Sequence, residues 1–375
     1  MRVSNYRQGN TTTTAVNQAI PQLKEPNIML SMKKIAIKTL VLASFGLLAL
    51  PYTATADLQT VGAKSMPTQG QTVAANEITV RKVQFLSQGT KVVGNLYLSA
   101  NIKAPQASVV VVGPQSSVKE QVSQVYARQL AAQGFVALTF DHRTFGESGG
   151  APRQFENPQM KVEDIHSAVT FLRALPEVKP DAVALMGICS GGGYSAKAAA
   201  MDSSINALVT VAGFYHDPQV MRQWLGENYE ARLNMGRQAR IKYEKTGQVD
   251  YMTNVEQNNL NVAMPGQEAY DYYGTNRGLR SGWVNRSAVM FFEPFLQFNA
   301  IDAGRDIKTP TLVIHSDSAL VPDGARRFFQ SIPTNQKNLH WMTTENHIAF
   351  YDQQEVVEEA AVKATAWLKQ TLSRN

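Results

Sequence analysis

One short stretch of the sequence has the residue types and the spacing of an enzymatic nucleophile. A glycine stands two residues before Cys189 and another stands two residues after it, in Gly187-Ile188-Cys189-Ser190-Gly191. Small residues at these positions allow a sharp strand-to-helix turn that exposes the thiol at a helix amino terminus, whose dipole favours the thiolate. Ser190 is the alternative nucleophile, but Ile188 would then stand where a small residue is needed. We therefore expect Cys189 to attack and the Ser190 backbone N–H to stabilise an oxyanion.

The elements that must position this turn alternate between short apolar strands and helices. Residues 108–112 read SVVVV, which is typical of a strand buried on both faces, and the runs at 135–140, 183–186 and 207–211 are similar. Helices are expected at 119–133, 161–174 and 194–201, and a hairpin at 78–86 and 91–98. This alternation predicts an α/β fold, a mostly parallel sheet with helices on both faces.

The alternation stops between residues 214 and 305. That stretch has no comparable strand, one long helix expected at 229–245, and 14 of the 32 aromatic residues. Strands resume at 311–315 and 339–342, with helices at 324–331 and 355–372. We expect residues 77–213 and 306–375 to form the two halves of one core, and residues 214–305 to form a helical lid over the carboxyl ends of the strands. A packing subdomain with no role in recognition is the alternative.

Several motifs together resemble the α/β-hydrolase superfamily, over about residues 80–370. The dienelactone-hydrolase-like branch also carries a cysteine in its elbow. Residues 141–148 (DHRTFGES) are similar to the family's strand-to-loop segment, residues 310–317 (PTLVIHSD) to the strand before its catalytic acid, and residues 346–351 (NHIAFY) to its histidine loop. The large insertion departs from the compact dienelactone hydrolases. The resemblance implies the α/β-hydrolase fold and a nucleophile–acid–base order along the chain.

The resemblance also implies the partners of Cys189. Of the six histidines, only His347 falls in a loop between the last expected strand and the last helix, so it is the expected base. Asp317 lies just past the strand at 311–315 and is the expected acid, with Asp323 and Asp302 as alternatives. An Asp in this place is otherwise a common turn residue.

The loop after the SVVVV strand should supply the second oxyanion donor. Pro114 has no N–H, so Gln115 is the expected donor, with Ser116 next. Tyr215, His216 and Trp283 are expected to line an apolar substrate pocket, although aromatic residues at this density are often core. No cofactor and no metal are expected.

The charge distribution argues against a nucleic-acid partner. The chain has 36 Lys and Arg against 30 Asp and Glu, but residues 1–56 hold six of the basic residues and one acid. The remainder therefore carries 30 basic and 29 acidic residues, which gives no electrostatic footprint for nucleic acid or an anionic membrane. The expected partner is a small-molecule substrate, and the sequence does not indicate an oligomeric state.

Residues 32–56 read as a secretory signal peptide within a leader of residues 1–56. Three lysines precede the uncharged run TLVLASFGLLAL, and Ala54-Thr55-Ala56 supplies a cleavage signature near Ala56. This run rises roughly 18 Å as a helix, short of the ~30 Å hydrocarbon core of a membrane. We expect a periplasmic or secreted protein with no membrane anchor after cleavage, a linker at residues 57–76, and Met32 as the true start.

These features together predict an exported hydrolase of carboxylic ester, lactone or thioester bonds. Cys189, His347 and Asp317 would form a triad that works through an acyl-thioester intermediate. A binding protein with the same fold but no turnover, and an acyltransferase, remain as alternatives.

Overall fold

The computed structural model describes residues 77–100 and 102–373. Within them, eight strands form one sheet in the order β1-β2-β4-β3-β5-β6-β9-β10. The first two strands are antiparallel to their neighbours and all later pairs are parallel. The strands are β1 (Ile78–Ser87), β2 (Thr90–Ser99), β3 (Gln106–Val112), β4 (Val136–Phe140), β5 (Val178–Ile188), β6 (Ala207–Val211), β9 (Thr311–Ser316) and β10 (Lys337–Met342).

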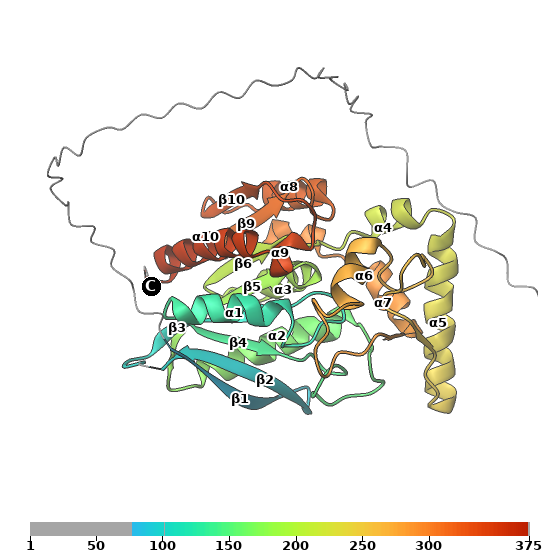
Figure 1. Ribbon diagram of the computed structural model, residues 1–375, viewed down its shortest axis with the longest axis horizontal. Helices are drawn as coiled ribbons and strands as arrows, with labels where there is room; N and C mark the ends of the chain where they lie inside the picture. The colour runs from blue at the N-terminus through green and yellow to red at the C-terminus, as the bar shows by residue number, and fades with distance from the viewer. Residues whose placement is uncertain (1–76, 101, 374–375) are drawn as a thin grey trace, which may run out of the picture. The chain divides into compact units, whose positions relative to one another are not determined.

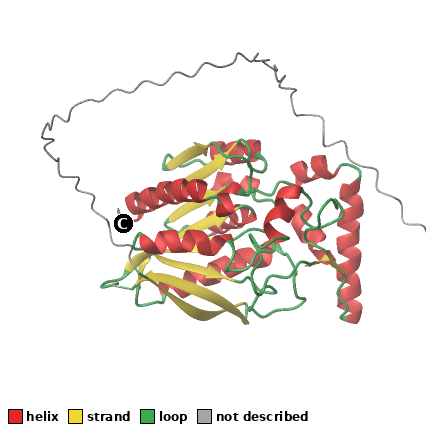
Figure 2. Cartoon of the chain, viewed as in Figure 1, coloured by secondary structure: helices red, strands yellow, loops and turns green. Residues whose placement is uncertain are grey.

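Helices cover both faces of this sheet, as Figures 1 and 2 show. One face packs against α1 (Val122–Ala132) and α10 (Gln354–Leu372), and the other against α2 (Pro158–Arg173), α3 (Ser190–Met201) and α8 (Pro322–Ser331). Alternate residues of a strand serve opposite faces, so Val109 and Val111 join the first core and Val110 and Val112 the second. The four-residue helix α9 (Ala349–Asp352) follows β10 and precedes α10.

The segment of residues 214–305, called the inserted segment below, adds no strand to the main sheet. Its longest helix is α5 (Asn228–Thr246), and its buried aromatic residues, except Tyr215, belong to the same core as α1 and α10. Its other elements are α4 (Pro218–Leu225), β7 (Tyr251–Met252), α6 (Gln267–Tyr273), β8 (Ser287–Ala288), a 3₁₀ turn (Val289–Phe291), α7 (Phe292–Gln297) and the start of a second 3₁₀ turn (Ile301–Asp306).

The predicted α/β-hydrolase architecture is confirmed in its sheet and its helices. Every strand and helix expected between residues 78 and 372 is present, most within three residues of the predicted bounds, although β5 begins five residues early. The signal peptide, its cleavage near Ala56 and the linker lie outside the described residues. Of the helices that the structure describes, none has the length and apolar content to cross a bilayer.

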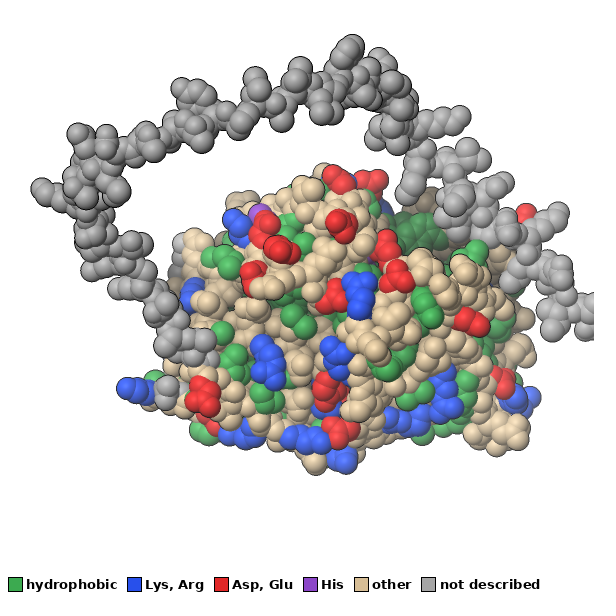
Figure 3. Space-filling view, in the orientation of Figure 1, with side chains coloured by type: hydrophobic (Ala, Val, Ile, Leu, Met, Phe, Trp, Pro, Cys, Tyr) green, Lys and Arg blue, Asp and Glu red, His purple; other side chains and the backbone are tan. Residues whose placement is uncertain are grey.

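Charged side chains of both signs are spread over the face seen in Figure 3. This mixture agrees with the near balance of acidic and basic residues after residue 56.

Candidate active site

Cys189 lies on a strained turn between β5 and α3. Its backbone angles are φ 54° and ψ −125°, outside the regions that residues with a side chain prefer. A Cβ on Gly187 would lie 2.2 Å from the Gly191 carbonyl oxygen, and one on Gly191 would lie 2.4 Å from the Val112 carbonyl oxygen. Both glycines are therefore required by backbone contacts, as expected from the sequence.

The Cys189 thiol is buried but has polar neighbours. The residue is 8% exposed, and burial raises the pKa of the thiol, while hydrogen bonds from the Tyr351 side chain and from the Ser190 backbone and side chain lower that pKa. The negative charge of Glu156 acts in the same direction as burial. The Ser190 backbone thus lies where an oxyanion donor was expected, at the start of α3.

The Tyr351 hydroxyl lies between His347 and this thiol. Its Nε2 is 3.3 Å from the Tyr351 hydroxyl oxygen, and its Nδ1 accepts a hydrogen bond from the Leu320 backbone N–H at 3.2 Å. Burial, together with the nearby His315, lowers the pKa of His347 to about 3, so the ring is neutral at neutral pH. Because Nδ1 is an acceptor, we assign the proton of the neutral ring to Nε2. In this arrangement His347 donates a hydrogen bond toward Tyr351 and is not poised as a base at Nε2.

The expected acid does not reach His347. The Asp317 side chain is 73% exposed and forms an ion pair with Arg326. Arg326 also pairs with Asp323, and Asp302 pairs with Arg305 at the surface. Among the described residues, the hydrogen-bond partner of His347 Nδ1 is a backbone amide and not a carboxylate. Asp317 therefore does not complete a Cys-His-Asp triad in this structure. Its carboxylate points outward, to solvent and to Arg326 of α8.

The loop after β3 lies against the nucleophile turn and is held by a buried carboxylate. Glu156 is fully buried and accepts hydrogen bonds from the Ser116 N–H at 2.9 Å and the Tyr194 hydroxyl at 2.7 Å. The Lys161 ammonium lies 2.8 Å from the same carboxylate. The Ser116 N–H is engaged by this carboxylate, and Gln115 as the second oxyanion donor stays a prediction.

The three residues expected to line a substrate pocket lie in different surroundings. Tyr215 stacks on Phe328 with ring centroids 3.9 Å apart and hydrogen-bonds Thr210, so it belongs to the core. His216 is fully buried among aromatic rings. These contacts place both side chains in the core, and their role in lining a substrate pocket stays a prediction. Trp283, in contrast, stacks on Tyr273 at 5.5 Å, and its indole N–H has no partner among the described atoms.

Tyr273 brings the inserted segment close to Cys189. Its hydroxyl is buried with no hydrogen-bond partner among the described atoms, and burial, together with the charge of the Cys189 thiolate, raises the pKa of that hydroxyl. Glu268 of α6 accepts the His347 backbone N–H at 3.3 Å. The inserted segment thus contacts both ends of the Cys189–His347 pair.

The sequence analysis missed Tyr351, Glu268 and Glu156. Tyr351 had a signal, because a residue four positions after a loop histidine returns to the same side of a helical turn. The other two had none, since they come from segments distant in sequence. Among the described residues, no cluster of His, Cys, Asp and Glu could hold a metal ion.

A mostly parallel sheet, a strained turn after its fifth strand and a histidine after its last strand define an α/β hydrolase. A family model described as "Serine aminopeptidase, S33" matches residues 103–354, and the chain belongs to this family. At the reactive position of the elbow this chain has a cysteine.

Several curated proteins are similar to this chain. The uncharacterized protein PA2218 of Pseudomonas aeruginosa is 31% identical over 287 residues, 72% of this chain and 76% of that protein. Its crystal structure matches with a TM-score of 0.68 and 28% identity, over 78% of this chain and 94% of that one. The thiohydrolase aneE of Aspergillus aculeatus is 35% identical over 159 residues, 40% of this chain and 49% of that protein.

Proposed function

We propose that this α/β hydrolase cleaves ester, lactone or thioester bonds of small molecules with Cys189 as nucleophile, in the manner of dienelactone hydrolases. The observation that carries the proposal is the strained turn that places the thiol at the start of α3 beside the Ser190 N–H. The thiohydrolase similar to part of this chain supports an acyl–sulfur or acyl–oxygen substrate. No metal or organic cofactor enters the proposal.

In the proposed reaction the Cys189 sulfur attacks the carbonyl carbon and forms a carbon–sulfur bond. The carbonyl electrons move to oxygen, where the Ser190 and Gln115 N–H groups stabilise the charge. The thiol loses its proton to water before it attacks, and collapse of the intermediate breaks the bond to the leaving group, which takes a proton from water as it departs. Water then cleaves the acyl-thioester, giving the carboxylic acid and restoring the thiol. Amides are poor substrates because a thiolate leaves more readily than an amine.

The test is a panel of esters, lactones and thioesters assayed with the wild type and with Cys189→Ala. We expect the wild type to hydrolyse part of the panel and the variant to retain none of that activity. Ser190→Ala keeps the backbone N–H and is the matched control, because it should retain turnover, reduced only by the loss of the hydroxyl that favours the thiolate. Hydrolysis by Cys189→Ala together with its loss in Ser190→Ala would transfer the role to the serine. No turnover by the wild type on any substrate would favour a binding protein.

Acyl transfer to an acceptor other than water is a second candidate. It is favoured by the burial of Cys189 beneath the inserted segment, which would act as a lid that limits water. An alcohol added to the hydrolysis assay would then yield a new ester in competition with the free acid. The free acid as sole product would exclude it.

We also propose that the protein acts after export, with the leader removed near Ala56. The support is the lysine-rich, apolar and small-residue pattern of residues 33–56. Amino-terminal sequencing should find a mature chain beginning at Asp57, in the periplasm or the medium. A mature protein that retains Lys33 would refute cleavage.

A further inference from the structure

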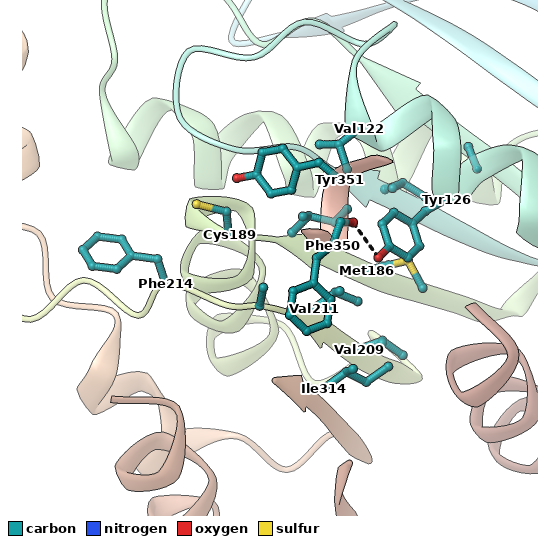
Figure 4. Packing of buried hydrophobic residues seen from close by; sticks show 14 of the residues in the cluster. Val122, Tyr126, Met186, Cys189, Val209, Val211, Phe214, Ile314, Phe350 and Tyr351 are labelled. Carbon is teal, nitrogen blue, oxygen red and sulfur yellow. Dashed lines mark hydrogen bonds between the residues drawn. The ribbon is translucent and has the colours of Figure 1, made fainter. Parts of the chain in front are cut away.

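The hydroxyl of Tyr351 lies between the two side chains that the sequence predicted to react with each other. It is 3.3 Å from His347 Nε2, and it lies near enough to the Cys189 thiol to lower the pKa of that thiol. Figure 4 shows the ring beside Cys189 with its hydroxyl on the side of the sulfur. The position of the ring is fixed by α9, whose Phe350 carbonyl accepts a hydrogen bond from the Tyr126 hydroxyl at 2.9 Å.

The direction of these hydrogen bonds follows from the Leu320 amide. That N–H can only donate, so His347 Nδ1 accepts and Nε2 carries the proton of the neutral ring. Nε2–H then donates to the Tyr351 oxygen, which leaves the Tyr351 O–H free to donate to sulfur. Each group in this chain then donates a hydrogen bond to the next: Leu320 to His347, His347 to Tyr351, and Tyr351 to the Cys189 sulfur.

We propose that Tyr351 is a catalytic residue whose hydroxyl donates a hydrogen bond to the Cys189 sulfur and stabilises the attacking thiolate. His347 is then a positioning residue, which holds the Tyr351 oxygen and strengthens its O–H as a donor. The role rests on Cys189 as the nucleophile of the proposed function. No proton has to pass from sulfur to imidazole, so His347 acts in its neutral form.

The surroundings of Tyr351 keep its proton on oxygen. Burial raises the pKa of the Tyr351 hydroxyl well above its usual value, and the nearby Cys189 thiolate raises it further. Two other groups act on the thiolate: the Ser190 N–H and hydroxyl favour it, and the charge of Glu156 opposes it. Tyr272 packs edge-on against Tyr351 with ring centroids 5.1 Å apart, and burial raises the hydroxyl pKa of both Tyr272 and the neighbouring Tyr273. Tyr351 is therefore a donor of fixed protonation state beside a thiol that titrates.

The test measures the thiol pKa directly, from the rate of iodoacetamide alkylation and the ultraviolet absorbance of the thiolate across pH. The chain has one cysteine, so both signals report Cys189 alone. In Tyr351→Phe, which removes only the hydroxyl, we expect the thiol pKa to rise by about one unit and the alkylation rate below that pKa to fall about tenfold. An unchanged thiol pKa in Tyr351→Phe overturns the proposal.

The matched control is Tyr126→Phe. This substitution removes a buried hydroxyl that holds α9 but does not contact the thiol. The thiol pKa of the Tyr126→Phe variant should therefore stay at the wild-type value. An equal rise in both variants would mean that Tyr351 acts only by supporting α9, and would refute the donor role. A second ionisation in the wild-type alkylation profile that disappears in His347→Gln would also refute it, because His347 would then titrate against the thiol.

These measurements need no substrate, so they separate the two proposals. A raised thiol pKa in Tyr351→Phe supports the donor role whatever the substrate panel shows. Ester hydrolysis that survives in Cys189→Ala would refute the proposed function, and with it the catalytic role of Tyr351, even if the thiol pKa shifts as expected.

Discussion

His216 is a neutral histidine enclosed by aromatic rings, and it should make the protein sensitive to mild acid. It is fully buried, its ring centroid lies 4.7–5.2 Å from those of Tyr194, Phe214, Phe295 and Phe298, and neither ring nitrogen has a partner among the described atoms. Burial, together with the charge of Lys161, lowers the pKa of His216 to about 3. Protonation in the folded state is therefore strongly disfavoured at moderate pH.

The size of the effect follows from the two pKa values. In the unfolded chain the His216 ring titrates near 6.5, so between about 3 and 6.5 the unfolded state binds the extra proton. The free energy of unfolding must then fall as pH falls through this window. At pH ~5 the loss from one such histidine is about 1.36 kcal/mol for each of ~1.5 pH units, or about 2 kcal/mol. His347, whose pKa is also lowered to about 3, should contribute a similar loss.

The assay is urea unfolding followed by tryptophan fluorescence, with the wild type and His216→Phe compared at pH ~7.5 and pH ~5. Phe keeps an aromatic ring in the enclosure and cannot be protonated. The variant should lose about 2 kcal/mol less than the wild type between the two pH values, while any constant packing cost cancels in that difference. An equal loss in both proteins would show that His216 is not held neutral by its surroundings.

Two further substitutions test the carboxylates of Asp317 and Glu156. Asp317→Asn should change kcat/KM by less than about twofold, because the side chain is exposed and pairs with Arg326; a loss approaching ~10⁴-fold, as for a triad aspartate, would contradict the structure. Glu156→Gln should lower the free energy of unfolding by about 3–5 kcal/mol, because the buried Lys161 ammonium loses its counter-ion. Replacing Lys161 by Met in the same chain should recover part of that loss, and a single variant as stable as the wild type would refute the ion pair.

The sequence predicted those parts of the site that depend on local chain geometry. Gly187 and Gly191 are needed because carbonyl oxygens of neighbouring segments lie where a Cβ would be, and this requirement is visible as spacing in the sequence. The buried strands were equally visible, since a run such as SVVVV has no polar residue to face solvent. The Gln115 loop could be placed because a parallel sheet brings the ends of β3 and β5 to the same edge.

The parts that failed depend on where side chains point after an element ends. Asp317 follows β9 as expected, but its side chain turns toward Arg326 on α8. His216 and Tyr215 follow β6, and their rings turn inward to Tyr194 and Phe328. The spacing of residues in the sequence does not predict these side-chain orientations. The contacts of Glu268 and Glu156 join segments far apart in the chain, so they need the fold itself.

The outward position of Asp317 is compatible with a sulfur nucleophile. An alcohol gives up its proton only to a strong, well-oriented base, which is why removing the aspartate of a serine triad costs so much activity. A free thiol has a pKa near 8.5 and is already a few per cent ionised at neutral pH. Its main need is stabilisation of the anion, because burial pushes the thiol pKa upward. In the roles proposed above, Tyr351 and Ser190 stabilise the thiolate directly, so the proposed attack by Cys189 does not require a carboxylate beside His347.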